Sequence, residues 1–461
     1  MNNRRNYGGL DIFRFCAALL VIAIHTSPLT SISEGADFFL TRVLARIAVP
    51  FFLMVTGQFV AAGFLNPSVR TTARLHKFLQ KTMLLYVFCI LLYLPVGIYA
   101  GHYTEMTVGS ALRMVIFDGT FYHLWYFPAC ILGIFLVELM SRFLGLRGMT
   151  VVSAVLYIIG LFGDSYYGLA QKVPALETAY EALFQVFSYT RNGLFMAPVF
   201  LVMGMWMAAG AEGNGKSGLS GSPAFCLGGL AVSFAAMTGE AFTLRHFELQ
   251  RHDSMYFALI PVMFFLYKCL LYPQTPSKKE FRTAASWIYI LHPAVIVAVR
   301  GIAKPLQMTG ILVDNSLIHY IAVALLSAAA GFFISYVSGK AKQPHLLSRI
   351  AGNRTARKAL QPEEELPYDA DEYDREYQEV SDMQADEYQN DYESRDREAQ
   401  DSRDGYTEEN EADELWSSNE SEEFQGGSWS PDESEEFQSR SWSPDESKEL
   451  QGGSWSPDES E

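Results

Sequence analysis

Ten apolar stretches, each about 20 residues long, follow one another through the first 340 residues and are separated by short polar segments. An α-helix needs a stretch of roughly this length and composition to cross the hydrocarbon core of a bilayer. The pattern therefore predicts an all-α integral membrane domain of about ten transmembrane helices over residues 1–340. The predicted helices cover about residues 10–29, 43–65, 78–100, 121–141, 149–168, 191–211, 218–238, 254–273, 283–303 and 315–338.

The polar segments between these helices carry unequal numbers of basic residues, which indicates how the chain crosses the membrane. With the amino terminus inside, eighteen Lys and Arg residues lie on the cytoplasmic side and seven lie outside. Basic residues concentrate on the cytoplasmic side of membrane proteins. We therefore predict a multi-pass protein of the cell (plasma) membrane with both termini in the cytoplasm.

The chain changes character after residue 340. Residues 341–360 are basic, and such a segment beside a membrane attracts anionic lipid. Residues 361–461 contain 36 acidic and 6 basic residues, a net charge of −30, whereas the first 360 residues carry +14. Few aliphatic residues and a high net charge predict a disordered acidic tail. Its 13-residue repeats are either motifs for a cytoplasmic partner or a neutral expansion, and each has one tryptophan: Trp416, Trp429, Trp442 and Trp455.

The first apolar stretch carries three ionisable side chains, Asp11, Arg14 and His25. Such groups cost several kcal/mol in a membrane and usually face a bundle interior or a wet cavity. Arg14 and His25 are eleven residues apart, which places them on one stripe of a helix, about 16 Å apart along its axis. A cation toward the cytoplasm and an imidazole toward the outer face favour a site that a substrate crosses. Alternatively, Arg14 extends to the interface and His25 packs in the core.

The predicted inner segment after the second helix is a basic patch that contains Arg74, Lys77 and Lys81. A patch of this kind attracts anionic lipid head groups, and it would equally attract a phosphorylated cofactor. We therefore regard these three residues as candidates for cofactor binding.

Two further histidines belong to predicted helices: His123 at the start of the fourth and His292 within the ninth. His123 and Trp125 open the fourth helix on the outer side and are candidate substrate-binding residues, although an aromatic belt at the membrane interface also explains Trp125. In the ninth helix, His292 precedes Pro293. We interpret this pair as packing residues.

The predicted outer connection before the eighth helix contains Arg251, His252 and Asp253. Arginine and histidine together in one short outer loop indicate a place for an anionic or polyhydroxyl acceptor. A solvated loop is the alternative. Asp253 or Ser254 is also expected to cap the following helix.

Motifs of soluble catalytic folds, such as GxSxG, the P-loop and HExxH, are absent from the sequence, and no His/Cys cluster has zinc spacing. Any chemistry therefore belongs within the helices, and we expect no metal and no nucleic-acid partner. A buried histidine such as His25 suits general-base work because its ordinary pKa lies near physiological pH.

Several motifs resemble the membrane acyltransferase-3 family. The first is LDIFRFCAALLVIAIH, in which Arg14, ten residues and His25 recur as the family's first-helix pattern. VPFFLMVTGQF is similar to its second-helix motif, HLWYF to its fourth-helix motif and IYILHP to its late-helix motif. The resemblance covers about residues 8–340.

Membership would imply an acyltransferase that moves an acyl group from cytoplasmic acyl-CoA, a co-substrate and not a tightly bound cofactor, to a hydroxyl or amine of a cell-envelope acceptor. His25 would be the general base and Arg14 its catalytic partner. Arg14, Arg74, Lys77 and Lys81 would hold the phosphates of coenzyme A. The family's basic motif after the second helix has paired arginines, and here Lys77 and Lys81 stand instead.

Within the family, AIHTSPL, RNGLFMAPVFLVMG and LQRHDSMYF resemble the membrane half of the membrane-bound serine/alanine racemases of vancomycin-resistance clusters. That half is linked with supplying L-serine across the membrane, so the alternative function is a carrier for a small amino acid. The racemases continue into a pyridoxal-phosphate domain, whereas here the basic segment and acidic tail follow, so we do not expect racemase activity.

Overall fold

The structure is a computed structural model that describes residues 6–103, 106–212, 222–273 and 275–341. The chain divides into two units, residues 1–385 and 386–461, and all described residues belong to the first. Apart from residue 341, the predicted basic segment and acidic tail with its repeats lie outside the described residues.

The described residues form helices joined by turns, without a β-strand among them. The predicted all-α fold is therefore confirmed for this part of the chain. The elements are α1 (Gly8–Thr26), α2 (Glu34–Phe38), η1 (Phe39–Val43), η2 (Leu44–Ile47), α3 (Ala48–Phe59), η3 (Ala61–Phe64), α4 (Val69–Tyr99), α5 (Val108–Arg113), η4 (Met114–Asp118), α6 (Tyr126–Ser141), α7 (Leu146–Phe162), α8 (Tyr167–Ala170), α9 (Pro174–Val186), α10 (Ala197–Glu212), α11 (Pro223–His246), α12 (Leu259–Leu271), α13 (Lys279–Ala303), α14 (Thr309–Leu312) and α15 (Ser316–Ala341).

Each of the ten predicted apolar stretches contains an apolar helix. In the described part, six helical segments are long and apolar enough to cross a membrane: Gly8–Thr26, Glu34–Phe59, Val69–Tyr99, Pro223–His246, Lys279–Ala303 and Ser316–Ser338. The other four apolar helices are shorter: Tyr126–Ser141, Leu146–Phe162, Ala197–Gly210 and Leu259–Leu271.

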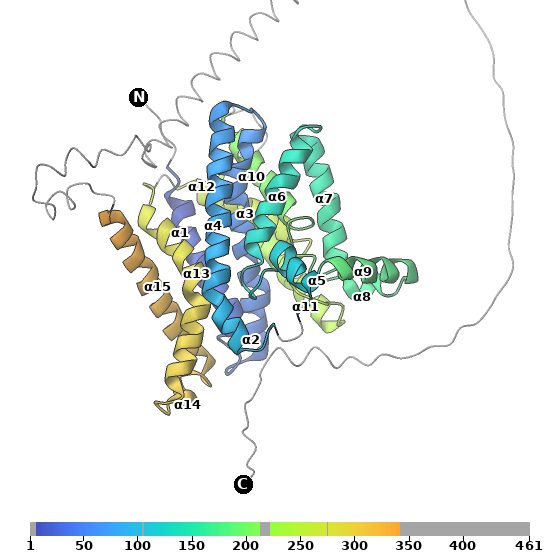
Figure 1. Ribbon diagram of the computed structural model, residues 1–461. Helices are drawn as coiled ribbons and strands as arrows, with labels where there is room; N and C mark the ends of the chain where they lie inside the picture. Colours follow the sequence, from blue (N-terminus) through green and yellow to red (C-terminus); the bar gives the residue numbers. More distant parts are fainter. Residues whose placement is uncertain (1–5, 104–105, 213–221, 274, 342–461) are drawn as a thin grey trace, which may run out of the picture. The chain divides into compact units, whose positions relative to one another are not determined.

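The long helices alternate in direction along the chain, so their connections collect at two ends of the bundle (Figure 1). We call one the Arg14 end; it contains residues 60–68, 142–145 and 272–278. The other is the His25 end, and its connections are residues 27–33, 100–125, 163–196, 247–258 and 304–315.

All four shorter apolar helices are shortened at the His25 end. Helices α6, α10 and α12 begin there, several residues later than the apolar pattern predicts, and α7 ends there early. The segments 119–125, 163–166, 187–196 and 247–258 are therefore not part of these helices. Non-helical backbone at membrane depth is tolerated only where protein buries it or where it lines a wet cavity. The His25 end thus has the architecture of a site.

Helix α1 lies inside the bundle, where it packs against α13, α3 and α15. Helices α3 and α10 cross closely at glycines: a Cβ on Gly57 would lie 2.1 Å from the carbonyl oxygen of Leu201, and one on Gly204 would lie 2.1 Å from that of Met54. Small residues allow such close crossings in membrane bundles. Helix α3, against which α1 packs, is thus held closely to α10.

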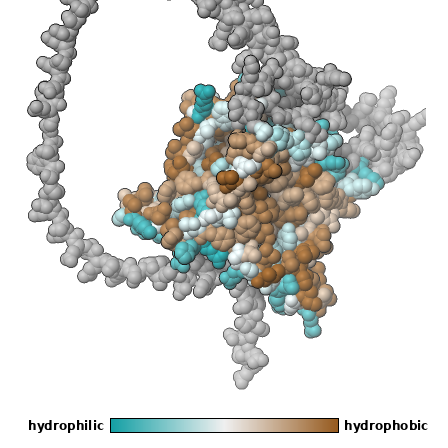
Figure 2. All heavy atoms as spheres, turned by 180° about the vertical axis from the view of Figure 1, so that it is seen from behind, coloured by the Kyte–Doolittle hydropathy of each residue, from teal (hydrophilic) through white to brown (hydrophobic). Residues whose placement is uncertain are grey.

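Apolar side chains are abundant on the outside of the bundle as well as in its core. Figure 2 shows them across much of the face seen from behind. Exposed leucine and phenylalanine side chains of α4, α11 and α15 contribute to this surface, among them Leu84, Leu91, Phe225, Leu325 and Phe333. An apolar exterior of this extent is what a bilayer covers.

Candidate active site

Helix α1 carries Arg14 near its start and His25 in its last turn. The helix runs unbroken from Gly8 to Thr26, so the two side chains belong to opposite ends of the bundle, as the eleven-residue spacing predicts. Both side chains are partly buried.

His25 belongs to a group of three histidines, here called the histidine cluster: His25, His123 and His292. The ring of His25 stacks on that of His292, with centroids 5.4 Å apart, and the ring of His292 meets that of His123 edge to face at 5.3 Å. His123 is 1% exposed and His292 is fully buried. In the described part of the chain, no group of three or more His, Cys, Asp or Glu side chains has the arrangement of a metal site.

Backbone contacts orient His292. Its Nδ1 lies 2.8 Å from the carbonyl oxygen of Tyr289 and 3.2 Å from that of Ile288, so Nδ1 donates and Nε2 keeps its lone pair. That Nε2 is buried without a hydrogen-bond partner. The prediction that His292 only packs is incomplete: the residue is buried, yet its ring faces the two other histidines.

Next to His292, one turn of the continuous helix α13 has its hydrogen-bond ladder interrupted. Pro293 has no N–H to donate, and the hydroxyl of Tyr93 from α4 is inserted nearby, donating to the carbonyl of Ile290 at 2.5 Å and accepting from the N–H of Ala294 at 3.3 Å. A side chain inserted into a helical hydrogen-bond ladder bends the helix. The interrupted turn adjoins His292 of the histidine cluster.

A second group, here called the arginine cluster, surrounds Asp253 and contains Arg42, Arg46 and Arg191. The carboxylate of Asp253 accepts from Arg42 at 3.2 Å and from Arg46. Arg191 donates to the hydroxyl of Ser254 at 3.1 Å. The three guanidinium groups are electrostatic neighbours of the His25 ring. The two clusters are therefore neighbours at the His25 end.

The structure corrects the prediction for Asp253. Helix α12 begins only at Leu259 with Ala258 as its N-cap residue, and the backbone N–H groups of Phe257 and Ala258 donate to Glu240 of α11. Burial by itself would raise the pKa of Asp253, but the positive charges of Arg46, Arg42 and Arg191 hold that pKa below its usual value. The carboxylate is thus a charged member of the arginine cluster rather than a helix cap.

The predicted outer residues Trp125, His252 and Arg251 lie around this site. The guanidinium of Arg191 stacks between Trp125, 5.3 Å from its ring centroid, and Tyr189 at 4.3 Å. The ring of His252 lies 4.7 Å from that of Tyr189. Burial, and then the charges of Arg191 and Arg251, lower the pKa of His252 to about 3, so its ring is neutral at physiological pH.

Arg251 points away from the arginine cluster. It donates to the carbonyl of Ser188 at 3.1 Å, and its guanidinium lies 3.5 Å from the centroid of the Phe184 ring. Of the three predicted residues in this loop, Asp253 lies inside the arginine cluster, His252 lies beside it and Arg251 supports the neighbouring helix α9.

Asp164 fixes the loop that carries Asp253. Its Oδ1 accepts from the backbone N–H of Ser254 at 2.7 Å and of Met255 at 3.0 Å. Its backbone carbonyl accepts from the N–H of Arg251 at 3.1 Å. Asp164 was assigned to a helix by the apolar pattern, but α7 ends at Phe162 and leaves it in a turn.

At the Arg14 end, Arg14 belongs to a network centred on Asp11. The carboxylate of Asp11 accepts from Arg14 at 2.7 Å, from the hydroxyl of Ser277 at 2.8 Å and from the N–H of Lys278 at 2.9 Å. Arg282 pairs with it at 3.5 Å. The network ties α1 to the start of α13.

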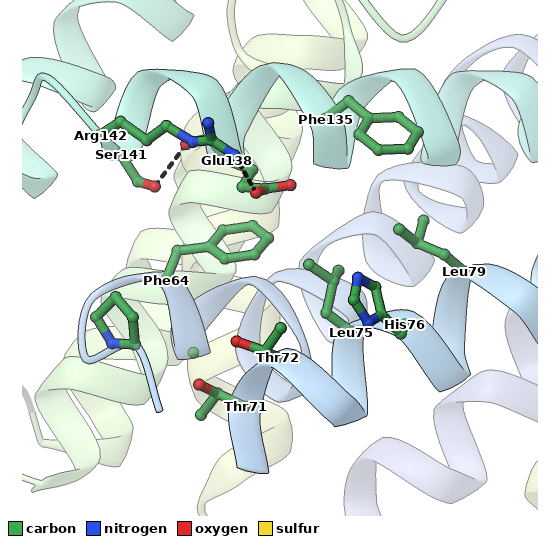
Figure 3. A pocket seen from close by; sticks show the side chains of 12 residues that line it. Phe64, Thr71, Thr72, Leu75, His76, Leu79, Phe135, Glu138, Ser141 and Arg142 are labelled. Atoms are coloured by element: carbon green, nitrogen blue, oxygen red, sulfur yellow. Dashed lines mark hydrogen bonds and ion pairs between the residues drawn. The ribbon is translucent and has the colours of Figure 1, made fainter. Parts of the chain in front are cut away.

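The predicted cofactor residues Arg74, Lys77 and Lys81 lie on the first turns of α4, where Arg74 is half-buried and the two lysines are exposed. A hollow of about 250 Å³ lies between the same part of α4 and α6 (Figure 3), but other residues of α4 line it, and Arg74, Lys77 and Lys81 do not. Its polar lining includes Thr72 and His76 of α4 and, on α6, Arg142 paired with Glu138 at 2.8 Å. These four lining residues were not predicted from the sequence.

The sequence profile of an acyltransferase domain matches residues 7–339. The chain belongs to the acyltransferase-3 family. The resemblance stated from the first-, second-, fourth- and late-helix motifs is therefore confirmed.

Three relatives are similar to this acyltransferase-3 protein over 330 to 339 residues. Two amino-acid racemases of Enterococcus faecalis are each 38% identical, over 73% and 71% of this chain and 46% and 45% of their own length. A serine/alanine racemase of Enterococcus gallinarum is 33% identical over 72% of this chain and 46% of its own. The chain spans about half the length of these relatives. No solved structure matches it.

Sequence reasoning missed part of the site of this acyltransferase-3 protein. Arg42 and Arg191 are two of the seven cations predicted to lie outside, and Arg46 lies in the second predicted helix, where no role in a site is predicted for it. An arginine inside an apolar stretch is itself a signal of function. A second signal appears only in the structure: Arg42 and Arg46 lie on η1 and η2, a π turn followed by a 3₁₀ turn. Such irregular turns are frequent at functional sites.

Proposed function

We propose that this protein is a membrane-embedded acyltransferase that moves an acyl group from acyl-CoA to a hydroxyl or amine of a cell-envelope acceptor. The observation that carries the proposal is the unbroken helix α1, which presents Arg14 at one end and His25, inside the histidine cluster, at the other. Family membership supports the reaction class.

In this proposal His25 takes the proton from the acceptor hydroxyl or amine. The freed electron pair attacks the carbonyl carbon of the thioester, the carbon–sulfur bond breaks, and His25 returns the proton to the thiolate of coenzyme A. Positioned proton transfer of this kind contributes about 10²–10⁴-fold to the rate. His292 keeps its Nδ1 bonded to backbone carbonyls and so gives the His25 ring a fixed surface.

The donor binds at the Arg14 end in this proposal. The cations Arg74, Lys77 and Lys81 at the start of α4 suit the phosphates of coenzyme A, and the hollow that other residues of the same part of α4 line suits another part of the cofactor. The pantetheine arm then extends along α1 toward His25. Arg14 contributes positive charge on this path.

The proposal includes the topology. We propose that all ten apolar helices cross the plasma membrane, with the Arg14 end and both termini in the cytoplasm. The alternation of the helices and the excess of basic residues at that end support this orientation. A reporter that is active only outside the membrane, fused after Tyr336, should be silent, and strong activity would contradict the orientation.

The catalytic assignment is tested with His25→Ala in membranes supplied with radiolabelled acyl-CoA and the cell-envelope fraction. Transfer per folded molecule should fall by about 10²–10⁴-fold, while the wild-type affinity for acyl-CoA is retained. His246→Ala is the matched control, since His246 is exposed at the end of α11. Unchanged transfer by folded His25→Ala would exclude His25 as the base.

A second candidate, a carrier for a small amino acid, is favoured by one observation: the relatives of known name are amino-acid racemases. Uptake of radiolabelled L-serine into proteoliposomes tests it. A carrier would show uptake without acyl-CoA and no acylated product, whereas the proposed enzyme requires acyl-CoA and forms one.

A further inference from the structure

The arginine cluster carries more positive charge than its carboxylates balance. Arg42 and Arg46 pair with one carboxylate, that of Asp253, and Arg191 has Asp253 and Asp164 as electrostatic neighbours. Asp118 is a further neighbour of Arg191, but it has its own partner in Arg113 at 3.6 Å and is not counted with the cluster. If all five groups are ionised, the net charge is +1. Uncompensated charge inside a membrane protein is costly and is retained where it serves a function.

Two donor atoms of this cluster are buried without a hydrogen-bond partner: Nε of Arg46 and Nε of Arg191. Leaving a buried donor unpaired costs about 1–3 kcal/mol, and more for a charged group. The Arg46 side chain is 8% exposed, so bulk water does not replace the missing partner. An acceptor atom of a bound ligand would supply the hydrogen bond that these donors lack.

The cluster runs inward from the surface of the His25 end toward His25. Side-chain exposure falls from 29% at Arg42 through 16% at Asp253 to 8% at Arg46. The hydroxyl of Tyr256 donates to the backbone carbonyl of Arg42 at 3.0 Å, and Asp164 holds the loop on the other side. A molecule entering past Arg42 would meet fixed guanidinium groups before it reaches the imidazole.

We propose that the arginine cluster binds the carboxylate group of a small acceptor and so directs the acceptor's hydroxyl or amine to His25. The transfer of an acyl group to this acceptor rests on the proposed function, whereas the binding of its carboxylate does not. Guanidinium groups hold carboxylates and phosphates through paired, charge-assisted hydrogen bonds. Net charge favours the carboxylate: one carboxylate neutralises the +1 of the cluster, whereas a phosphate dianion would leave −1.

The binding is measured on the purified full chain in detergent, without acyl-CoA, from the shift of its thermal unfolding midpoint with ligand concentration. The probe is sodium L-lactate, which carries a carboxylate and a hydroxyl. Propane-1,2-diol, which lacks the carboxylate, and sodium chloride at equal ionic strength are the controls. Lactate should raise the midpoint in a saturable way, and the two controls should not.

Three variants test where the probe binds. Arg46→Gln should weaken lactate binding by about tenfold or more, the loss expected for a charge-assisted hydrogen bond. Arg245→Gln should leave it unchanged, since Arg245 is exposed on α11 and stacks on Phe38 outside the cluster. Asp253→Asn should tighten it, because the internal carboxylate no longer competes for Arg42 and Arg46. Misfolding cannot produce tighter binding.

Absence of a lactate shift in the wild type would overturn the proposal, as would a shift that Arg46→Gln leaves intact. Tighter binding of inorganic phosphate than of lactate would overturn the carboxylate assignment. The outcome is separate from that of the His25→Ala experiment. Lactate binding without acyl transfer would support the carboxylate site and contradict the proposed acyltransferase function. Acyl transfer without lactate binding would support the proposed function and contradict the carboxylate site.

Discussion

The two ends of helix α1 differ in how completely their buried polar groups are hydrogen-bonded. At the Arg14 end, Asp11 is surrounded by donors from Arg14, Ser277, Lys278 and Arg282. At the His25 end, buried polar atoms lack partners in both clusters and on Asp164. Of the ten such atoms among the described residues, six belong to this site: Arg46 Nε, His123 Nδ1 and Nε2, Asp164 Oδ2, Arg191 Nε and His292 Nε2.

The paired carboxylate of Asp11 stabilises the fold, whereas the unpaired donors at the His25 end are available to bind a ligand. A buried carboxylate with several donors rigidifies its surroundings, whereas an unpaired buried donor costs free energy until something binds it. The helices reflect the same difference. They are shortened at the His25 end, where non-helical segments carry the site residues. Four changes test the comparison.

Of these four changes, His292→Ala is expected to have the largest effect, because it removes the ring that stacks on His25. The His25 imidazole would lose its fixed position, and a displacement of about 1 Å can cost on the order of 100-fold in rate. We expect kcat to fall by about 10–100-fold while KM for acyl-CoA, whose proposed site is at the other end, stays the same. A parallel rise in that KM would show general damage to the bundle instead.

A smaller effect, on stability, is expected from Asp164→Asn. The neutral amide is a weaker acceptor for the N–H groups of Ser254 and Met255, and a loss of about 1–3 kcal/mol follows if these are left unpaired. The unfolding midpoint should fall and lactate binding should weaken, because the Asp253 loop is released. Asp11→Asn is the matched change at the other end. It should lower the midpoint without weakening lactate binding.

His252 gives a dependence of stability on pH. Its pKa is about 3 in the folded protein and near 6.5 when unfolded, so the unfolded chain binds more protons between these values. The contribution of His252 to stability is therefore fully present above pH 6.5 and is lost as the pH falls toward 3. Between pH 7 and pH 5 the midpoint of the wild type should fall more steeply than that of His252→Gln. Equal slopes would contradict the lowered pKa.

The smallest effect is expected from removing the acidic tail, which neither end of α1 requires in the proposed mechanism. A chain that stops after Lys358 should insert and transfer acyl groups like the full chain, because the sequence of the tail predicts disorder. The measurement is transfer per folded molecule. Loss of transfer at equal abundance would give the tail a part in the reaction.

The sequence by itself determined the class of fold and the first-helix pair. Apolar runs of about 20 residues report membrane helices because hydrocarbon demands an apolar surface and internally bonded backbone. The spacing of Arg14 and His25 was equally readable, because both lie on one regular helix with a fixed rise and turn. The motifs around them were sufficient to recognise the family.

Only the tertiary structure decided which other residues join His25. His123, Arg42, Arg191 and His292 come from four segments distant in sequence, and no local pattern encodes their meeting. The ends of α6, α7, α10 and α12 were misplaced for a related reason: composition measures how apolar a stretch is, but hydrogen bonds from neighbouring segments decide where its helix ends. Asp164 is the clearest case, since the backbone N–H groups of Ser254 and Met255, about 90 residues away in sequence, hold its carboxylate outside a helix.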